Sequence, residues 1–331
     1  MPALPAALYY FIVGFIVLNA VIGMVTYVTL LERKFAARMQ SRIGPYRVGP
    51  HGLLQPIADA VKLMMKEDVV PTLADRPVYN LAPIVFLIPC MLIFATMPFA
   101  PGLGVADLNI GILFFLAVSA MEIVGLFMAG WGSNNKYALL SAMRAVNQII
   151  SYDLPFIFVA LVPVVLAGSL RLSDIAQAQT GFFGAFIFYP VVGQLAFIAY
   201  IVTTLAAENR VPFDILEAES ELVAGFRVEY SGMKFALIQL GEYAHAIGTS
   251  FLGALLFLGA WSGPGPAWLG PLWFLLKAMA VFLLITWVRW SFVRIRVDQI
   301  LAISWKLMLP ASLLLLMATA AWVGWRSAGG A

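Results

Sequence analysis

Eight uninterrupted apolar segments constrain this chain more than any other feature. Each is long enough to cross about 30 Å of hydrocarbon as a helix. They lie at residues 8–31, 81–98, 110–131, 146–168, 183–206, 235–261, 271–290 and 307–325. Because 62% of the residues are hydrophobic and only 11% charged, too little polar surface remains for a water-soluble globule. The sequence predicts one all-α polytopic membrane domain, residues 1–331, with about eight transmembrane helices.

The basic residues predict how the chain is oriented. Eight spans place both termini on one side of the membrane, where the loops hold only Arg171 and Arg326, whereas the opposite loops hold most of the lysines and arginines. By the positive-inside rule, we expect the long loops in the cytoplasm and both termini on the periplasmic side of a bacterial inner membrane. The first segment lacks a preceding basic region, and we interpret it as a retained span. The net charge of +3 then reflects topology, so nucleic acid is not an expected partner.

The first long polar segment, residues 32–80, is predicted to be a cytoplasmic loop. It begins with a basic run in which two Gly-Pro steps exclude a continuous helix, and it contains an amphipathic helix at 52–67. The polar residues of this helix recur at spacings of four, three and four, at Gln55, Asp59, Lys62 and Lys66. It is too short and too charged to span, so we expect it at the membrane surface or against the spans. There it could line an entrance for a lipid-soluble molecule.

The second polar segment, residues 207–233, is predicted to be an acidic cytoplasmic loop. Its six acids are Glu208, Asp214, Glu217, Glu219, Glu221 and Glu229. Only Arg210 and Arg227 lie among them as counter-charges, and we expect the arginines of residues 289–296 to approach them as well. Because like charges packed this closely raise one another's pKa, the cluster is suited to binding and releasing protons near neutral pH.

Four ionisable residues lie inside predicted spans. They are Glu122, Asp153, Glu242 and Lys277. A charge at the centre of a membrane helix costs about 2.5 to 3.5 kcal/mol on insertion scales, so each should be neutral, paired or beside a polar cavity. One such acid could serve only to join two helices through a hydrogen bond. Four of them in four spans favour a polar path through the membrane.

Several kinds of cofactor site are excluded by the residue types. Cys90 is the only cysteine, which rules out a Cys-ligated iron-sulfur cluster within this chain. The two histidines, His51 and His245, lie in different segments, which argues against a bis-His haem. Nucleotide-binding, hydrolase and zinc-protease motifs are absent. We expect no metal and no cofactor bound by this chain.

Five motifs, in order along the chain, resemble one family. They are the run at 32–63 containing Gln-Ser-Arg-Ile-Gly-Pro-Tyr-Arg-Val-Gly-Pro, Ala-Gly-Trp-Gly-Ser-Asn-Asn-Lys-Tyr at 129–137, Asn-Arg-Val-Pro-Phe-Asp at 209–214, Glu-Ala-Glu-Ser-Glu-Leu-Val-Ala-Gly at 217–225 and Glu-Tyr-Ser-Gly-Met-Lys-Phe-Ala at 229–236. Together they are similar to the H subunits of the proton-pumping NADH:quinone oxidoreductase, respiratory complex I. The similarity spans nearly the whole chain.

The resemblance implies a subunit of an enzyme complex that is a translocase. Such a subunit forms part of the quinone chamber and couples quinone reduction to proton translocation, with quinone as the substrate. The implied partners are other membrane-arm subunits, the lipid bilayer and cytoplasmic-arm subunits, one of which carries the iron-sulfur cluster that supplies electrons. By position, the residues similar to the quinone chamber and its rim are Glu32, Arg33, Arg42, Asp59, Arg294 and Asp298. Those similar to the proton relay are Glu208, Asp214, Glu217, Glu219, Glu221, Glu122, Asp153 and Glu242.

The chain departs from the family pattern at two acids. Glu208 stands one residue away from the usual position, which on a helix turns a side chain by about 100°, and Asp153 replaces the usual glutamate. If the acidic loop is helical, Glu217 and Glu221 share a face that excludes Glu219. Two other functions stay open, the equivalent subunit of a membrane-bound hydrogenase complex and a free-standing ion channel or transporter. Co-purifying subunits would separate the first, and ion flux through the isolated chain the second.

Overall fold

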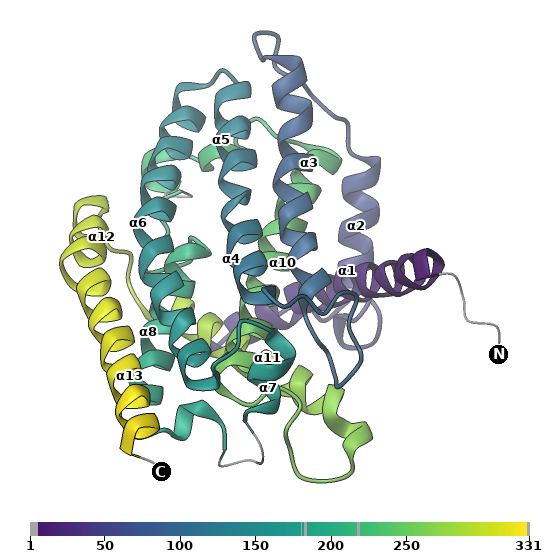
Figure 1. Ribbon diagram of the computed structural model, residues 1–331. Helices are drawn as coiled ribbons and strands as arrows, with labels where there is room; N and C mark the ends of the chain where they lie inside the picture. Colours follow the sequence, from purple (N-terminus) through teal and green to yellow (C-terminus); the bar gives the residue numbers. More distant parts are fainter. Residues whose placement is uncertain (1–5, 180, 182–183, 217–218, 330–331) are drawn as a thin grey trace.

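The computed structural model describes residues 6–179, 181, 184–216 and 219–329, and its regular elements within these ranges are helices (Figure 1). The α-helices are α1 (Ala6–Met39), α2 (Gln55–Met65), α3 (Arg76–Leu92), α4 (Gly111–Ala120), α5 (Glu122–Gly132), α6 (Lys136–Ala167), α7 (Leu172–Gln177), α8 (Val192–Ala207), α9 (Glu219–Leu222), α10 (Gly232–Phe257), α11 (Gly270–Ser291), α12 (Val297–Ile303) and α13 (Leu309–Gly329). The all-α class is confirmed.

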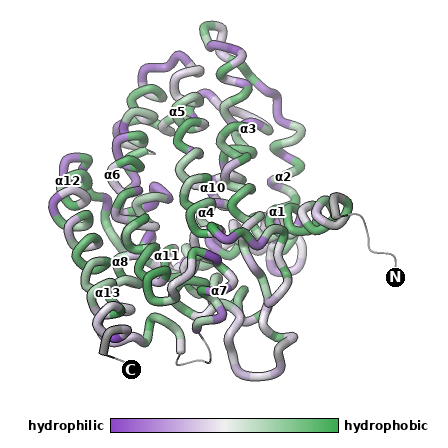
Figure 2. The backbone as a smooth tube through the Cα atoms, in the orientation of Figure 1, coloured by the Kyte–Doolittle hydropathy of each residue, from purple (hydrophilic) through white to green (hydrophobic). Residues whose placement is uncertain are grey.

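Helices lie in all eight predicted apolar segments. In the described part of the chain, six helical stretches are long and apolar enough to cross a membrane, and α8 is a shorter apolar helix. The remaining segment is α10, which is 26 residues long and carries Glu242 and His245. In Figure 2 hydrophobic residues cover most of the helices, while hydrophilic ones gather in the loops at one end of the bundle. A polytopic membrane protein is therefore confirmed.

The first helix is longer than the sequence predicted. We expected it to end near Leu31, but α1 continues to Met39 because residues 32–39 contain no helix breaker, and the first Gly-Pro step comes only at Gly44. As a result Glu32 and Arg33 stand on a rigid helix instead of a loop. The amphipathic helix is present as α2, and it is shorter than predicted because a 3-10 turn at Pro50–Gly52 precedes it.

The bundle is built around α6, α10 and α3. α6 packs against α5, α8 and α13, and α10 packs against α3 and α11. The outer helices contribute little to this core, since only 17% of the apolar window is buried in the first and last long stretches, compared with 56% in α6. Figure 1 places α1 and α13 on opposite sides of the bundle. Their exposed apolar faces are suited to lipid or to other membrane chains.

Two local features of the packing place Glu122 beside α3. α4 and α5 are separated at Met121, so that Glu122 opens a new helix in the middle of an apolar stretch. α5 then approaches α3 so closely at Gly125 that a Cβ there would lie 2.4 Å from the backbone nitrogen of Phe86. Only glycine permits this approach, which sets Glu122 beside the face of α3 that carries Cys90.

Candidate functional site

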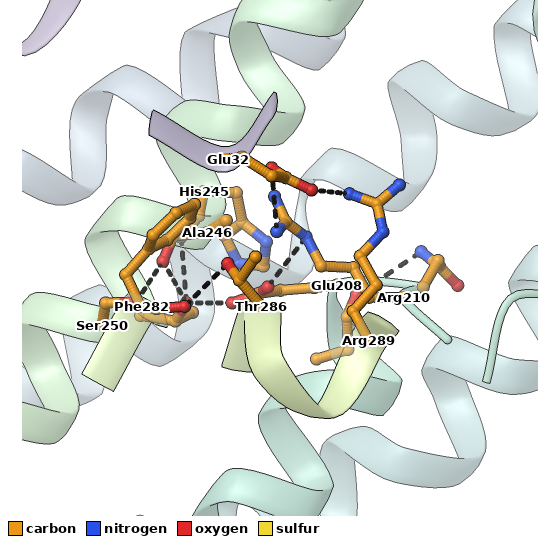
Figure 3. Close-up of polar contacts among 12 residues, drawn as sticks. Glu32, Glu208, Arg210, His245, Ala246, Ser250, Phe282, Thr286 and Arg289 are labelled. Atoms are coloured by element: carbon orange, nitrogen blue, oxygen red, sulfur yellow. Dashed lines mark hydrogen bonds and ion pairs between the residues drawn. The ribbon is translucent and has the colours of Figure 1, made fainter. Parts of the chain in front are cut away.

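Two acids and two arginines from α1, α11 and the end of α8 form a buried charge cluster (Figure 3). Glu32 of α1 forms an ion pair with Arg289 of α11, and its other oxygen lies 3.6 Å from Nη1 of Arg210. Nε of Arg210 lies 3.2 Å from Oε2 of Glu208, which caps the C-terminus of α8. The side chains of Glu32 and Glu208 are 4% and 2% exposed. Charges so deeply buried are tolerated because they balance one another.

Neighbouring side chains fix the geometry of this charge cluster. The Thr249 hydroxyl of α10 donates a hydrogen bond to Glu208 Oε1 at 2.6 Å. The guanidinium carbon of Arg210 lies 5.2 Å from the ring centroid of Tyr243 and 5.4 Å from that of Phe282, within the range of cation–π attraction. Arg210 is thus held by two carboxylates and two aromatic rings.

Glu208 is the acid of this cluster that lies beyond the end of a membrane helix. Burial raises its pKa above the ordinary value for glutamate, although Arg210 and the hydrogen bond from Thr249 both act to lower it. A carboxyl group with a raised pKa binds and releases protons closer to neutral pH. Glu208 stands one residue from the usual family position, and it nevertheless lies inside the charge cluster.

A polar cavity of about 170 Å³ lies beside the charge cluster. Its ionisable walls come from α5, α10, α11 and the segment after α8, and they include Glu122, Glu208, Arg210, Asp214, Arg227, Glu242, Tyr243, His245 and Arg289. Within it, Nη1 of Arg227 lies 2.7 Å from Glu242 Oε2. The volume is enough for several water molecules. The cavity collects most of the described acids that the sequence predicted to form a proton relay.

Glu122 lies at the membrane side of the polar cavity. Its side chain is 7% exposed, and its Oε2 atom is 3.3 Å from Nδ1 of His245 and 3.4 Å from Sγ of Cys90. These contacts join α5 to α10 and α3. Glu122 was expected to be neutral, paired or beside a polar cavity, and it has polar contacts and lines the polar cavity.

A second hollow, which we call the α2 groove, lies between α1, α2 and α10. It has a volume of about 140 Å³, and its polar wall contains Arg33 and Asp59, whose side chains approach to 2.5 Å. Partial burial raises the pKa of Asp59, but the hydrogen bonds from Arg33 and Gln55 and the charges of Arg33 and Lys62 outweigh it, so the net direction is downward. Gln239 and Tyr243 line both the α2 groove and the polar cavity. Two side chains of α10 therefore separate the two hollows.

Other predicted site residues lie away from both hollows. The exposed Arg42 contacts Gln40 at 2.6 Å, and the exposed Asp298 contacts Arg296 at 3.1 Å. Arg294 is also exposed. The backbone N–H of Ile295, the residue after Arg294, donates a hydrogen bond to the carbonyl oxygen of Pro212. The loop after α11 therefore lies against the loop after α8.

Two of the remaining predicted relay acids do not line the polar cavity. Glu221 is exposed and lies 2.5 Å from Arg144, outside the polar cavity. Asp153 is partly buried in α6 and does not line the polar cavity. Glu219 begins α9, whereas Glu217 lies outside the described residues, so the predicted alignment of these acids stays a prediction.

We expected the arginines of residues 289–296 to approach the acidic loop, and Arg289 does so, since it lines the polar cavity together with Glu208 and Asp214. Arg289 reaches the buried cluster and pairs with Glu32 of α1, while Arg296 pairs with Asp298 in its own turn. The central positions of Arg210 and Arg289 were missed as site residues. A signal for Arg210 was its place two residues after Glu208, and for Arg289 its place in the last turn of an apolar helix.

Metal ligands do not converge anywhere in the described ranges, where no group of three His, Cys, Asp or Glu side chains could hold an ion. The cluster is instead suited to holding fixed charges and moving protons. The carboxylates, imidazole and tyrosine that line the adjacent polar cavity are groups that can exchange protons in water-filled sites.

Comparison with known proteins gives a consistent result. Residues 12–320 match the family model described as NADH dehydrogenase. A protein from Dehalococcoides mccartyi, named as the H subunit of NADH-quinone oxidoreductase, is 49% identical over 88% of this chain and 80% of its own length. Proteins with the same name from Geobacillus kaustophilus and Chlorobaculum parvum are 45% and 43% identical, over 96% and 90% of this chain and 94% and 88% of their own lengths.

Proposed function

Because this chain belongs to the family of NADH-quinone oxidoreductase H subunits and is thus a membrane component of an enzyme complex, we propose that it helps form the quinone chamber and couples quinone reduction to proton translocation. The observation that carries the proposal is the common wall of the α2 groove and the polar cavity. Gln239 and Tyr243 face both, so a molecule in one hollow lies within a side chain's width of the charges in the other.

The α2 groove is the part that accepts quinone. Apolar residues of α1, α2 and α10 line most of it, and Arg33 and Asp59 lie at its polar side. A quinone with an apolar tail can enter from the bilayer between these helices and present its oxygens to the polar side. Electrons come from an iron-sulfur cluster in a neighbouring cytoplasmic-arm subunit, and other membrane-arm subunits receive the protons.

The polar cavity is the part that responds to reduction. Reducing a quinone to a quinol consumes two electrons and two protons, so charge appears transiently beside the common wall. The field of that charge acts strongly on Glu208, Arg210 and Arg289 because little water screens them. A change in the protonation of Glu208 then passes to Glu122 and Glu242, which line the same cavity.

A quinone-binding role is tested by Asp59→Asn in the assembled complex. Loss of the Arg33 partner should raise the KM for quinone several-fold, with the rate of NADH oxidation by a soluble artificial acceptor unchanged. Lys66→Gln is the matched control, since it removes one charge from the end of the same helix without touching the α2 groove. An unchanged KM in Asp59→Asn would count against quinone binding at this site.

The proton-coupling role is tested by Glu122→Gln. The amide is close in size to the carboxyl group and stays polar, but it cannot take up or release a proton at neutral pH. In complex reconstituted into sealed vesicles, proton translocation should fall by about tenfold or more, as expected when a proton-transfer group is lost. Translocation at the wild-type rate would remove Glu122 from the relay.

We also propose an orientation of this chain in the membrane. Both termini lie on the periplasmic side and the acidic loop on the cytoplasmic side of a bacterial inner membrane, as the distribution of basic residues supports. Cys90 is buried, so substituted cysteines can be labelled against a low background. Ser327→Cys should react from the periplasmic side and Lys136→Cys from the cytoplasmic side, and the reverse pattern would contradict this topology.

A further inference from the structure

His245 is a buried imidazole that the family-derived relay does not include. It lies in α10 with its side chain 7% exposed, and Nδ1 is 3.3 Å from Glu122 Oε2. Its other ring nitrogen, Nε2, is buried and has no hydrogen-bond partner among the described residues. A buried polar atom left in this way costs about 1 to 3 kcal/mol, so a purely structural histidine would be a poor choice here.

The position of the ring explains this arrangement. His245 lines the polar cavity together with Glu208 and Arg210, while Glu122 holds the ring from the α5 side. Nδ1 thus contacts Glu122, and the ring borders the polar cavity that Glu208 also lines. In Figure 3 the imidazole of His245 lies among the side chains of the charge cluster.

The charged and titratable groups around His245 come from every neighbouring element. They are Glu122 of α5, Cys90 of α3, Glu242 and Tyr243 of α10, Arg289 of α11, and Glu208, Arg210, Asp214 and Arg227 of the segment after α8. The charge of Arg210 disfavours a permanent positive charge on the ring, whereas Glu122 favours a transient one. An imidazole that is neutral at rest and becomes protonated only transiently is suited to carrying protons.

We propose that His245 carries protons between Glu122 and the polar cavity, so that it connects the membrane acid with Glu208. This inference rests on the proposed function and adds a residue to it. In one direction, the O–H bond of protonated Glu122 breaks and a bond forms at Nδ1, which gives an imidazolium ion. The N–H bond at Nε2 then breaks and its proton passes into the cavity, by way of water, toward Glu208. Rotation of the ring, or transfer in reverse, restores the first tautomer.

The test is His245→Asn in the complex reconstituted into sealed vesicles. The Asn amide can contact Glu122 near the Nδ1 position, but it cannot take up and release a proton at neutral pH. We expect the rate of proton translocation to fall by about tenfold or more, with NADH oxidation by a soluble artificial acceptor unchanged. His51→Asn is the control, because His51 is exposed and has φ of 53°, a conformation that asparagine tolerates.

A second variant is needed in case His245→Asn does not fold or assemble. His245→Gln places its amide nearer the Nε2 position, and if only one of the two variants assembles, that variant decides the question. The double variant Glu122→Gln with His245→Asn should translocate protons no more slowly than the worse single variant, because both residues act in one path. Additive losses would overturn the proposal.

The outcomes separate this inference from the proposed function. If Glu122→Gln loses translocation while an assembled His245→Asn or His245→Gln keeps the wild-type rate, the relay through Glu122 stands and the role of His245 is refuted. If Glu122→Gln keeps the wild-type rate, the relay itself fails. If both single variants lose translocation and the double variant adds nothing, both proposals are supported.

Discussion

Replacing Arg210 by methionine is the perturbation whose effect follows most directly from the geometry. The guanidinium lies 3.2 Å from Glu208 and 3.6 Å from Glu32, and both carboxylates are almost fully buried. Methionine has a similar length and no charge, so it would leave two acids to share Arg289. Breaking a buried pair by removing one partner costs about 3 to 5 kcal/mol. Loss of the contacts with the Tyr243 and Phe282 rings adds about 0.5 kcal/mol or more for each.

The assay is thermal inactivation of the purified complex, followed by release of this chain on a native gel. A loss of about 3 to 5 kcal/mol corresponds to a change of about two to four orders of magnitude in an equilibrium constant, so inactivation should occur at a clearly lower temperature. Arg144→Met is the control, because it breaks an ion pair with Glu221 that is partly exposed and should cost about 1 kcal/mol at most.

A double variant separates charge balance from packing. In Arg210→Met with Glu208→Gln one buried negative charge is removed together with its partner, so part of the lost stability should return. If Arg210→Met were as stable as Arg144→Met, the charge cluster would not hold these helices together, and the reasoning from buried charge would be refuted.

Three further predictions follow from other contacts. Gly125→Ala should destabilise the complex by about 1 to 3 kcal/mol or more because its Cβ would lie 2.4 Å from the backbone of Phe86, whereas Gly23→Ala, with open space around it, should be neutral in the same thermal assay. Lys277→Met should cost about 1 to 3 kcal/mol, since Nζ donates to the carbonyls of Leu258 at 2.6 Å and Ser262 at 2.5 Å beyond the end of α10, and Lys277→Gln should lose less. The lowered pKa of Asp59 means that its stabilising ion pair is fully present above about pH 4. It is lost as the pH falls through the folded-state value, so the difference in thermal midpoint between wild type and Asp59→Asn should stay constant from pH 8 to 5 and narrow below about pH 4.

The fold was largely predictable because hydrophobic length is a local property. Each apolar segment could be recognised by itself, and α2 by its polar spacing. Ends of helices were less predictable. α1 passes the membrane boundary as far as Met39 because nothing in residues 32–39 stops it, and charge alone does not end a helix.

The candidate site was predicted in its acids but not in its connections. Glu208, Glu122, Glu242 and Asp214 line one cavity, as a relay of acids would require. The partners of these acids depend on contacts between distant parts of the chain. Glu32 and Arg289 are 257 residues apart in sequence, and no local pattern relates them.

His245 also depends on a contact between distant parts of the chain. From the sequence it was one polar residue a helical turn after Glu242, on a helix whose neighbours were unknown. Only the close approach of α5 at Gly125 brings Glu122 to its ring, and that approach depends on the packing of α3 between them. Pairwise packing of helices, which sequence periodicity does not specify, therefore determines which of these polar groups meet.

The central claim is that the buried charge cluster couples quinone reduction to proton translocation, and Glu208→Gln tests it most directly. The measurement is the number of protons translocated per NADH oxidised by the complex in sealed vesicles, with Asp107→Asn, an exposed acid paired with Arg171 far from the polar cavity, as control. The account predicts that Glu208→Gln translocates fewer protons per NADH, or oxidises NADH with quinone much more slowly, while the control keeps the wild-type values. Wild-type turnover and an unchanged proton ratio in Glu208→Gln would contradict it.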